Sequence, residues 1–287
     1  MFEGFEERRI RTAGAEIFLR TAGSGPPLLL LHGYPQTHAM GHRVAPWLAE
    51  RFTVVCPDLR GYGASSKPAS DPEHLTYSKR ATAQDLVEVM ASLGFDRFRV
   101  AGHDRGARVT HRLALDHPER VERLALLDIV PTLDVFNGVD QHVATATYHW
   151  FFLIQPAPFP ETLIGHDPAY FLRWHLRSWS AGRDDFFAPE ALAAYDAAFA
   201  NPATIHATCE DYRAGASIDL VHDRADSGRH VECPALVLWG EKGKPANLTE
   251  VWRRYLADVT GKALSAGHFL AEEVPDETAA ALLEFFA

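Results

Sequence analysis

The chain has 287 residues and a formal net charge of −10, from 28 basic and 38 acidic side chains, and 47% of its residues are hydrophobic. This acidic balance argues against nucleic acid as a partner, and every apolar run is far shorter than the roughly 20 residues that cross a bilayer, so no membrane association is expected. The length fits one large α/β unit, or a core with an insertion, better than several small domains.

The N-terminal segment, residues 1–10, lacks the apolar core of a signal sequence. The three cysteines, Cys56, Cys209 and Cys233, have neither the spacing of a metal site nor that of a disulfide framework. We therefore expect buried, reduced thiols in a cytoplasmic protein, and no metal site.

Short apolar runs alternate with stretches of helical periodicity over the first 130 residues. A fully apolar run such as residues 27–31 is typical of a parallel strand buried on both faces. Apolar residues three and four positions apart predict helices over 78–93 and 107–117. Strands are predicted over residues 16–20, 27–31, 52–57, 97–101 and 121–129.

The pattern changes after residue 130, where aromatic residues, histidine and proline become frequent and helical stretches such as 190–199 occur. Alternation resumes with a strand over 235–239 and helices over 248–256 and 275–286. We therefore predict an α/β fold with a mostly parallel sheet and helices on both faces. Its core is expected to comprise residues 1–130 and 229–287. A helical cap, residues 131–228, is inserted after the strand predicted over 121–129, which is taken as the sixth strand of the fold.

Residues 99–108 combine a strand, the turn Gly102-His-Asp104-Arg-Gly106 and the start of a helix. This is the pattern of a nucleophile elbow, in which a strained turn lifts the central side chain off the sheet. The central residue is an aspartate, which displaces a leaving group at saturated carbon better than it transfers acyl groups. The pattern therefore disfavours a serine esterase and favours an ester intermediate on Asp104; a turn that merely caps a helix is the alternative.

An ester on Asp104 needs a base that activates water, and His268 lies in a loop of small residues near the C-terminus. A nucleophile followed much later by a histidine is the order of the α/β-hydrolase triad. We expect Asp128, which follows a predicted strand, to orient the imidazole, and Glu241 is the alternative acid.

The loop His32-Gly-Tyr34-Pro follows the strand predicted over residues 27–31. Its backbone can face the elbow, so the amides of Tyr34 and Arg105 are the candidate oxyanion hole. We expect the His32 side chain to be structural.

Six segments together resemble the fluoroacetate dehalogenases of the α/β-hydrolase superfamily, and the resemblance covers nearly the whole chain. Each segment alone is weak evidence, but the combination is specific, and it implies the α/β-hydrolase fold. The segments are HGYPQT, PDLRGYGASSKP, GHDRGARV, LLDIVPT, YHWFF and AGHF.

The resemblance implies that Arg105 and Arg108 bind the substrate carboxylate, which suits two planar guanidinium groups one helical turn apart. It also implies that His149, Trp150 and Tyr212 hold the departing halide; a strongly hydrated fluoride needs several N–H and O–H donors at once. Without the resemblance, the arginines could be surface groups paired with acids and YHWFF a packing face.

Tyr34 departs from the family, which often has phenylalanine there; the change is harmless if only the amide binds. A homodimer is a further implication of the resemblance, and the chemistry needs no cofactor. Other aromatic and histidine side chains of the cap are interpreted as packing or surface groups: Trp174, His175, Trp179, His206 and His222.

The expected activity is hydrolysis of fluoroacetate and related small-molecule 2-haloacids to 2-hydroxyacid and halide. An epoxide hydrolase would use the same Asp104 and His268, with Tyr148 and Tyr212 as proton donors, but an epoxide, like a haloalkane, has no use for Arg105 and Arg108. A hydrolase-fold ligand receptor without catalytic activity is the alternative from another class of protein.

Overall fold

The computed structural model describes residues 1–243 and 247–287. Its centre is an eight-stranded sheet in the order β1-β2-β4-β3-β5-β6-β7-β8. The first two pairings, β1 with β2 and β2 with β4, are antiparallel, and the others are parallel. The strands are β1 (Glu6–Arg11), β2 (Glu16–Ala22), β3 (Pro27–Leu31), β4 (Thr53–Pro57), β5 (Phe98–His103), β6 (Val121–Leu127), β7 (Ala235–Gly240) and β8 (Val259–Leu264).

Strand β1 was not predicted. Its sequence, EERRIR, is charged and exposed almost throughout, so it lacks the apolar alternation by which a half-buried strand is recognised. It forms because its backbone pairs with β2 at the edge of the sheet. The predicted inner strands are present, and all the β7 residues and most of those in β3 are buried, as their apolar runs predicted.

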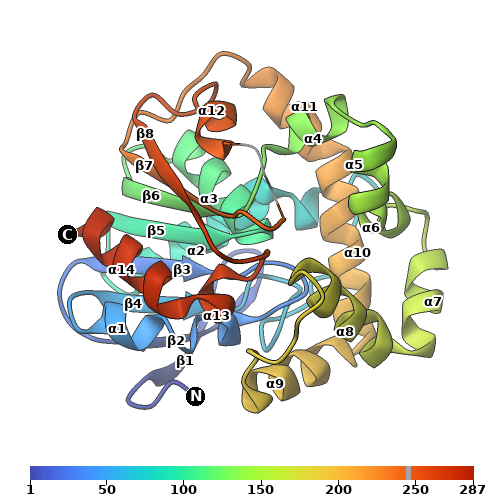
Figure 1. The fold of residues 1–287 in the computed structure, drawn as a ribbon, viewed down its shortest axis with the longest axis horizontal. Coiled ribbons are helices and arrows are strands. Elements are labelled where there is room, and N and C mark those ends of the chain that lie inside the picture. The colour runs from blue at the N-terminus through green and yellow to red at the C-terminus, as the bar shows by residue number, and fades with distance from the viewer. Residues whose placement is uncertain (244–246) are drawn as a thin grey trace.

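Helices cover both faces of the sheet, with α1 and α14 in front of it and α2 and α3 behind it in Figure 1. The helix predicted over 248–256 is shorter than expected, because it ends at Trp252. The helices outside the β6–β7 insertion are α1 (Ala45–Ala49), α2 (Lys79–Ser92), α3 (Arg105–Asp116), α12 (Leu248–Trp252), α13 (Leu270–Glu273) and α14 (Pro275–Phe286), with short 3-10 helices η1 (His38–Gly41) and η2 (Leu75–Tyr77).

Eight further helices follow one another between β6 and β7, within the range expected for the cap. Figure 1 shows them gathered on one side of the sheet, with the long helix α10 beside the core. They are α4 (Thr132–Asn137), α5 (Gln141–Ala146), α6 (Tyr148–Leu153), α7 (Phe159–His166), α8 (Pro168–Trp179), α9 (Pro189–Phe199), α10 (Pro202–Ala216) and α11 (Ile218–Ala225).

Parallel pairing brings the carboxyl ends of β3, β5, β6, β7 and β8 to one edge of the sheet. The loops after these strands carry Tyr34, Asp104, Asp128, Glu241 and His268. In open α/β sheets this edge is where ligands bind.

No helix within residues 1–243 and 247–287 is long and apolar enough to cross a membrane. Within the same residues, no group of three or more His, Cys, Asp or Glu side chains could hold a metal ion. Cys56 and Cys209 are buried, but the expectation that all three thiols are buried is wrong for Cys233, which is partly exposed.

Candidate active site

Asp104 lies in a tight turn between β5 and α3, with a left-handed backbone (φ 49°, ψ −116°) that a non-glycine residue rarely adopts. The turn is possible because its neighbours lack side chains. A Cβ atom on Gly106 would lie 2.3 Å from the carbonyl oxygen of His32, and one on Gly33 would lie 2.5 Å from the Cβ of Asp104. The glycines therefore let the His32 loop and α3 close around Asp104, which is 8% exposed.

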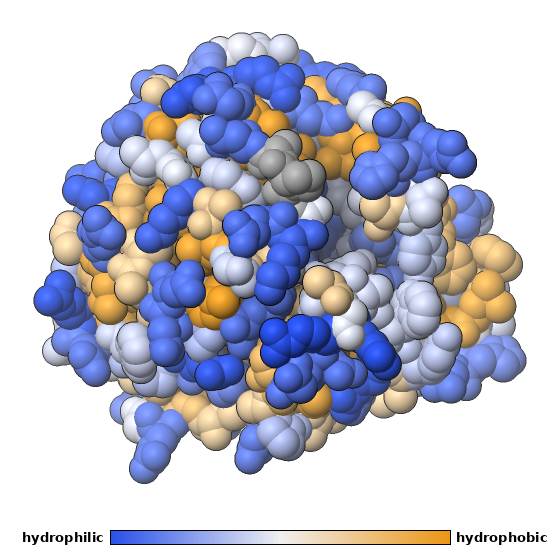
Figure 2. Space-filling model, viewed as in Figure 1, coloured by the Kyte–Doolittle hydropathy of each residue, from blue (hydrophilic) through white to orange (hydrophobic). Residues whose placement is uncertain are grey.

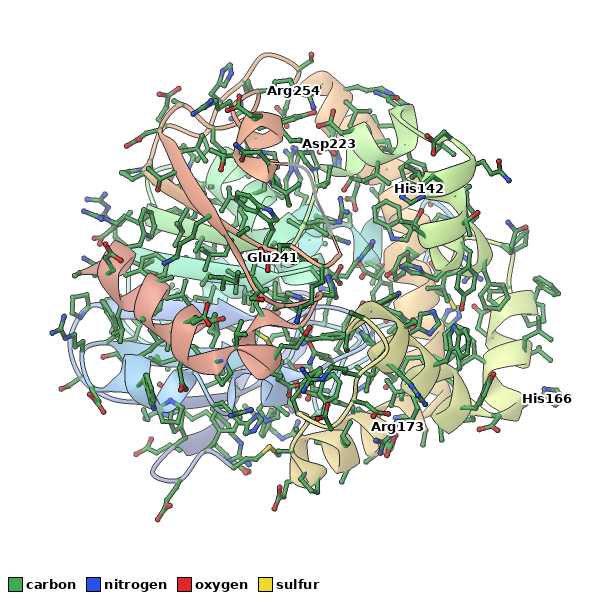
Figure 3. All side chains as sticks on the ribbon, viewed as in Figure 1. His142, His166, Arg173, Asp223, Glu241 and Arg254 are labelled. Atoms are coloured by element: carbon green, nitrogen blue, oxygen red, sulfur yellow. The ribbon has the colours of Figure 1, made fainter. Side chains whose placement is uncertain are left out.

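His268 lies between two carboxylates. Its Nδ1 donates to Oδ2 of Asp128 at 2.6 Å, and its Nε2 is 3.7 Å from Oδ2 of Asp104. The other Asp128 oxygen accepts the Gly240 amide at 2.9 Å, so the carboxylate is fixed at the end of β6. The alternative acid, Glu241, is exposed at the end of β7, where Figure 3 labels it.

Two neighbours, which were given no role at the site on the basis of sequence, support the His268 loop. His103 Nε2 is 2.8 Å from the His268 carbonyl oxygen, and the centroids of the two rings are 4.5 Å apart. Burial, together with the nearby His268, lowers the pKa of His103 to about 3, so His103 is a neutral donor to that carbonyl. The Trp179 carbonyl accepts the His268 amide at 3.0 Å.

The two oxygens of Asp104 have different surroundings. Oδ1 accepts the Tyr34 amide at 2.9 Å, whereas Oδ2 faces His268. The Arg105 amide is the first of α3 and therefore has no acceptor within its helix. Burial by itself would raise the pKa of Asp104, but His268, His103 and the two arginines lower it, so Asp104 is a carboxylate at neutral pH.

Arg105 and Arg108 are buried (2% and 5% exposed), so neither is a surface group. The Arg105 guanidinium lies 4.1 Å from the Tyr212 ring centroid, and that of Arg108 lies 4.5 Å from the Trp150 ring centroid. Arg108 Nη1 donates to the Thr132 hydroxyl, and its Nε has no hydrogen-bond partner within the described part of the chain. Burial, reinforced by the charge of Arg105, lowers the pKa of Arg108 to about 10, so it is still a cation at neutral pH.

His149 and Trp150 on α6 meet Tyr212 on α10. The Tyr212 ring centroid lies 5.8 Å from that of His149 and 6.1 Å from that of Trp150. All three side chains are buried. Burial, together with the nearby His175, lowers the pKa of His149 well below its usual value, so the neutral imidazole offers one N–H donor.

Two residues interpreted as packing or surface groups in fact adjoin this cluster. The Trp179 ring centroid is 4.6 Å from that of His149 and 5.5 Å from that of His268, and the His175 centroid is 5.6 Å from that of His149. The spacing of 175 and 179 puts both residues on one face of α8, and that periodicity was the available signal. Asp211, which was not among the predicted site residues, accepts a hydrogen bond from Arg105 Nε at 2.8 Å.

Figure 2 shows a hollow between the sheet core and the inserted helices. An aspartate elbow, a histidine hydrogen-bonded to a second aspartate and a mostly parallel sheet define an α/β hydrolase. The chain matches the family model of the alpha/beta hydrolase fold over residues 26–274.

Individual proteins agree with this class. The chain is 51% identical over 290 residues to a fluoroacetate dehalogenase from Burkholderia sp, covering 100% of this chain and 95% of the relative. It is 34% identical over 270 residues to a soluble epoxide hydrolase from Corynebacterium sp., covering 93% of this chain and 92% of the relative. The solved structure of an α/β hydrolase from Nostoc sp PCC 7120 superposes with a TM-score of 0.98 at 57% identity and covers 100% of this chain and 99% of its own. The chain belongs to the fluoroacetate dehalogenase family of the α/β-hydrolase superfamily, whose members act on carbon–halide bonds.

Proposed function

We propose that this protein hydrolyses the carbon–halogen bond of fluoroacetate and related 2-haloacids, giving a 2-hydroxyacid and halide. The observation that carries the proposal is the pair of buried arginines beside the elbow aspartate, one of which keeps an N–H group without a partner among the described residues. Arg105 is paired with Asp211. Arg108 donates instead to the neutral Thr132 hydroxyl, and a buried cation of this kind needs an anion. A carboxylate with a leaving group on its α-carbon supplies that anion and also gives Asp104 a bond to break.

The first step is attack by Asp104 at the α-carbon. Oδ1 is held by the Tyr34 amide, so Oδ2 is the free nucleophile. Its electron pair forms the C–O bond of an ester while the carbon–halogen bond breaks, and the halide leaves with that bond's electrons. Arg105 and Arg108 hold the substrate carboxylate, so the α-carbon is presented to Oδ2 in line with the departing halide.

The halide leaves toward His149, Trp150 and Tyr212. Their imidazole N–H, indole N–H and phenol O–H groups are three neutral donors on adjoining rings. Such donors replace part of the hydration shell of the ion, and this matters most for fluoride, which water holds strongly. None of these steps calls for a metal or a cofactor.

The second step is hydrolysis of the ester. His268 Nε2 takes a proton from water, and the hydroxide attacks Cγ of Asp104. The amides of Tyr34 and Arg105 stabilise the negative charge on Oδ1. The C–O bond to the product then breaks while the His268 imidazolium returns its proton to the departing oxygen, and the Asp104 carboxylic acid loses its proton to solvent. Asp128 keeps the protonated imidazole oriented through its 2.6 Å contact with Nδ1.

An epoxide hydrolase fits the side chains less well. That activity needs two cap tyrosines near the aspartate, and Tyr212 is suitably buried, but Tyr148 is 43% exposed and its hydroxyl lies 3.2 Å from His175 Nε2. The same activity would also leave the buried guanidinium of Arg108 without an anion, since its side-chain partner is the neutral Thr132 hydroxyl.

The deciding measurement is halide release from fluoroacetate and chloroacetate, with hydrolysis of styrene oxide assayed on the same preparation. We expect halide release that disappears in Asp104→Ala. Diol formation without halide release would make the protein an epoxide hydrolase. Saturable haloacid binding with no turnover of either substrate would make it a receptor.

We further infer that residues 131–228 act as a cap over this site, that the protein works in the cytoplasm and that it forms a homodimer. Support for the dimer comes from a group of exposed apolar and aromatic side chains on α7 and α8, the α7–α8 patch. Figure 2 shows a hydrophobic area at its right edge, where Figure 1 places α7. A patch of this kind marks an association surface. It comprises Phe159, Leu163, Tyr170 and Trp174.

Leu163→Glu is expected to shift the protein from dimer to monomer, because a charge would be buried in the contact. Sedimentation velocity checks the change in mass. Leu75→Glu is the matched control, since Leu75 on η2 is 49% exposed against 51% for Leu163. If Leu163→Glu remains a dimer, the dimer interface lies outside the α7–α8 patch.

A further inference from the structure

Asp211 belongs to helix α10 of the insertion, but its carboxylate lies among residues of the core. Oδ2 accepts from Arg105 Nε at 2.8 Å and from the Tyr62 hydroxyl at 2.7 Å, and Oδ1 accepts from Lys79 Nζ. The residue is 6% exposed. Burial by itself would raise the pKa of Asp211, but the charges of Arg105 and Lys79 hold it well below its usual range. Asp211 is therefore a fully ionised group, fixed by three donors.

These contacts fix the plane of the Arg105 guanidinium. Besides the Nε contact, Arg105 Nη2 donates to the Asp211 backbone carbonyl at 2.5 Å, and one face of the group lies 4.1 Å from the centroid of the Tyr212 ring. A guanidinium has five N–H donors. Two of them are directed to Asp211, so the Nη1 edge and the second Nη2 hydrogen remain for a ligand.

The two arginines of the site therefore differ. Burial by itself would lower the pKa of Arg105, but Asp211 raises it above its ordinary value. Arg108 donates to the neutral hydroxyl of Thr132 instead, and its pKa is lowered. Much of the Arg105 charge is thus compensated within the protein, whereas that of Arg108 is compensated less.

We infer that Asp211, held by Lys79 and Tyr62, is a positioning residue that fixes Arg105 so that its free edge aligns the substrate carboxylate, while Arg108 supplies most of the charge that attracts it. The inference rests on the proposed function, because the carboxylate is that of the 2-haloacid. It assigns Arg105 to orientation and Arg108 to affinity. Asp211 also couples the alignment to the docking of α10 on the core.

Asp211→Asn keeps the shape of the side chain and removes its charge. It therefore separates alignment of the substrate carboxylate from affinity for it. Loss of alignment is expected to slow chloride release in a single turnover at saturating chloroacetate by about tenfold or more. The inhibition constant of acetate, an unreactive carboxylate, is expected to change by less than about threefold, because a repelling charge is lost along with the alignment. An ion pair that only attaches α10 to the core would instead weaken acetate binding and lower the melting temperature.

Glu161→Gln is the matched control. Glu161 on α7 pairs with Arg213, which lies on α10 as Asp211 does: Glu161 Oε1 is 2.7 Å from Arg213 Nη1. The substitution removes this carboxylate, and neither Glu161 nor Arg213 contacts Arg105. We expect its single-turnover rate to equal that of the wild type. If Asp211→Asn and Glu161→Gln lowered the single-turnover rate equally, the role of Asp211 would be structural and the inference would be overturned.

Tyr62→Phe tests the same contact with less risk to folding, since it removes one hydrogen bond to Asp211 and leaves every charge in place. We expect the single-turnover rate to fall about two- to tenfold, with the acetate inhibition constant unchanged. Wild-type rates in both Tyr62→Phe and Asp211→Asn would refute the positioning role while the wild-type enzyme still releases halide. A wild-type protein that releases no halide would refute the proposed function itself, and the inference with it.

Discussion

His268 touches both carboxylates of the candidate triad, but at different distances. The 2.6 Å contact with Asp128 fixes the ring, whereas the 3.7 Å separation from Asp104 Oδ2 is longer than a hydrogen bond. The geometry thus keeps Nε2 available for a water molecule beside the ester. Asp104 can therefore act as the nucleophile in the first step, and His268 as the base in the second.

His268→Asn is therefore expected to stop the reaction after the first step. One chloride should be released from chloroacetate per protein chain, and Asp104 should accumulate as its carboxymethyl ester. Mass spectrometry of the peptide that contains Asp104 measures the adduct. His142→Asn, at an exposed histidine on α5 labelled in Figure 3, is the control and should turn over normally. Continued turnover in His268→Asn would remove His268 from the role of base.

At the scale of elements, the site depends on how closely α3 approaches the loop after β3. Gly106 is in the first turn of α3, and its Cα faces the carbonyl of His32. The helix begins at Arg105, two residues before the start predicted from apolar periodicity, because the elbow leads directly into it. The close approach places the Tyr34 amide on Asp104 Oδ1.

Gly106→Ala is expected to destabilise the protein by several kcal/mol, of the order of an overpacked core substitution, and to abolish activity. The added Cβ would lie 2.3 Å from backbone that cannot move without displacing β3. Urea unfolding measures the loss. Gly165→Ala on α7, where a Cβ meets nothing within 4 Å, is the control and should be neutral or slightly stabilising. A stable, active Gly106→Ala would show that the elbow relaxes.

At the scale of the whole molecule, Glu272 joins core and insertion. It is fully buried on α13 and accepts the hydroxyl of Tyr195 on α9 at 2.6 Å and Gln36 Nε2 at 3.3 Å. His42 Nδ1 is 3.8 Å away, and Arg43 binds the Glu272 backbone carbonyl. Burial raises the pKa of Glu272 to about 8, although Tyr195 and Arg43 oppose the rise.

This raised pKa predicts a pH-dependent stability. An unfolded glutamate titrates near pH 4.3, roughly, so from there to the folded pKa of about 8 the folded state holds the proton more tightly and loses stability as pH rises. Glu272→Gln removes this loss. Its unfolding free energy relative to wild type should rise by up to about 1.4 kcal/mol per pH unit between pH 5 and 8.

Urea unfolding at several pH values measures this difference. Glu284→Gln, at an exposed position on α14, is the control and should show no such slope. A constant difference between Glu272→Gln and wild type across this range would mean that Glu272 is already ionised when buried.

Local sequence determined much of this protein. The apolar runs gave the inner strands, because a strand buried on both faces has to be apolar throughout, and Gly102 and Gly106 marked the elbow because only residues without side chains fit there. The order of Asp104, Asp128 and His268 along the chain was enough to suggest the candidate triad, and the resemblance supplied Arg105, Arg108 and the aromatic cluster.

Contacts between residues far apart in the chain account for the remaining features of the site. The tertiary structure favoured Asp128 over Glu241 through a single contact, and it brought Trp179 and Asp211 to the site from helices whose sequences suggest packing alone. It also gave the charged segment Glu6–Arg11 a strand partner. The physical reason is the same in each case: ion pairs, ring contacts and sheet edges join residues far apart in the chain, and no local periodicity records which distant group will lie opposite.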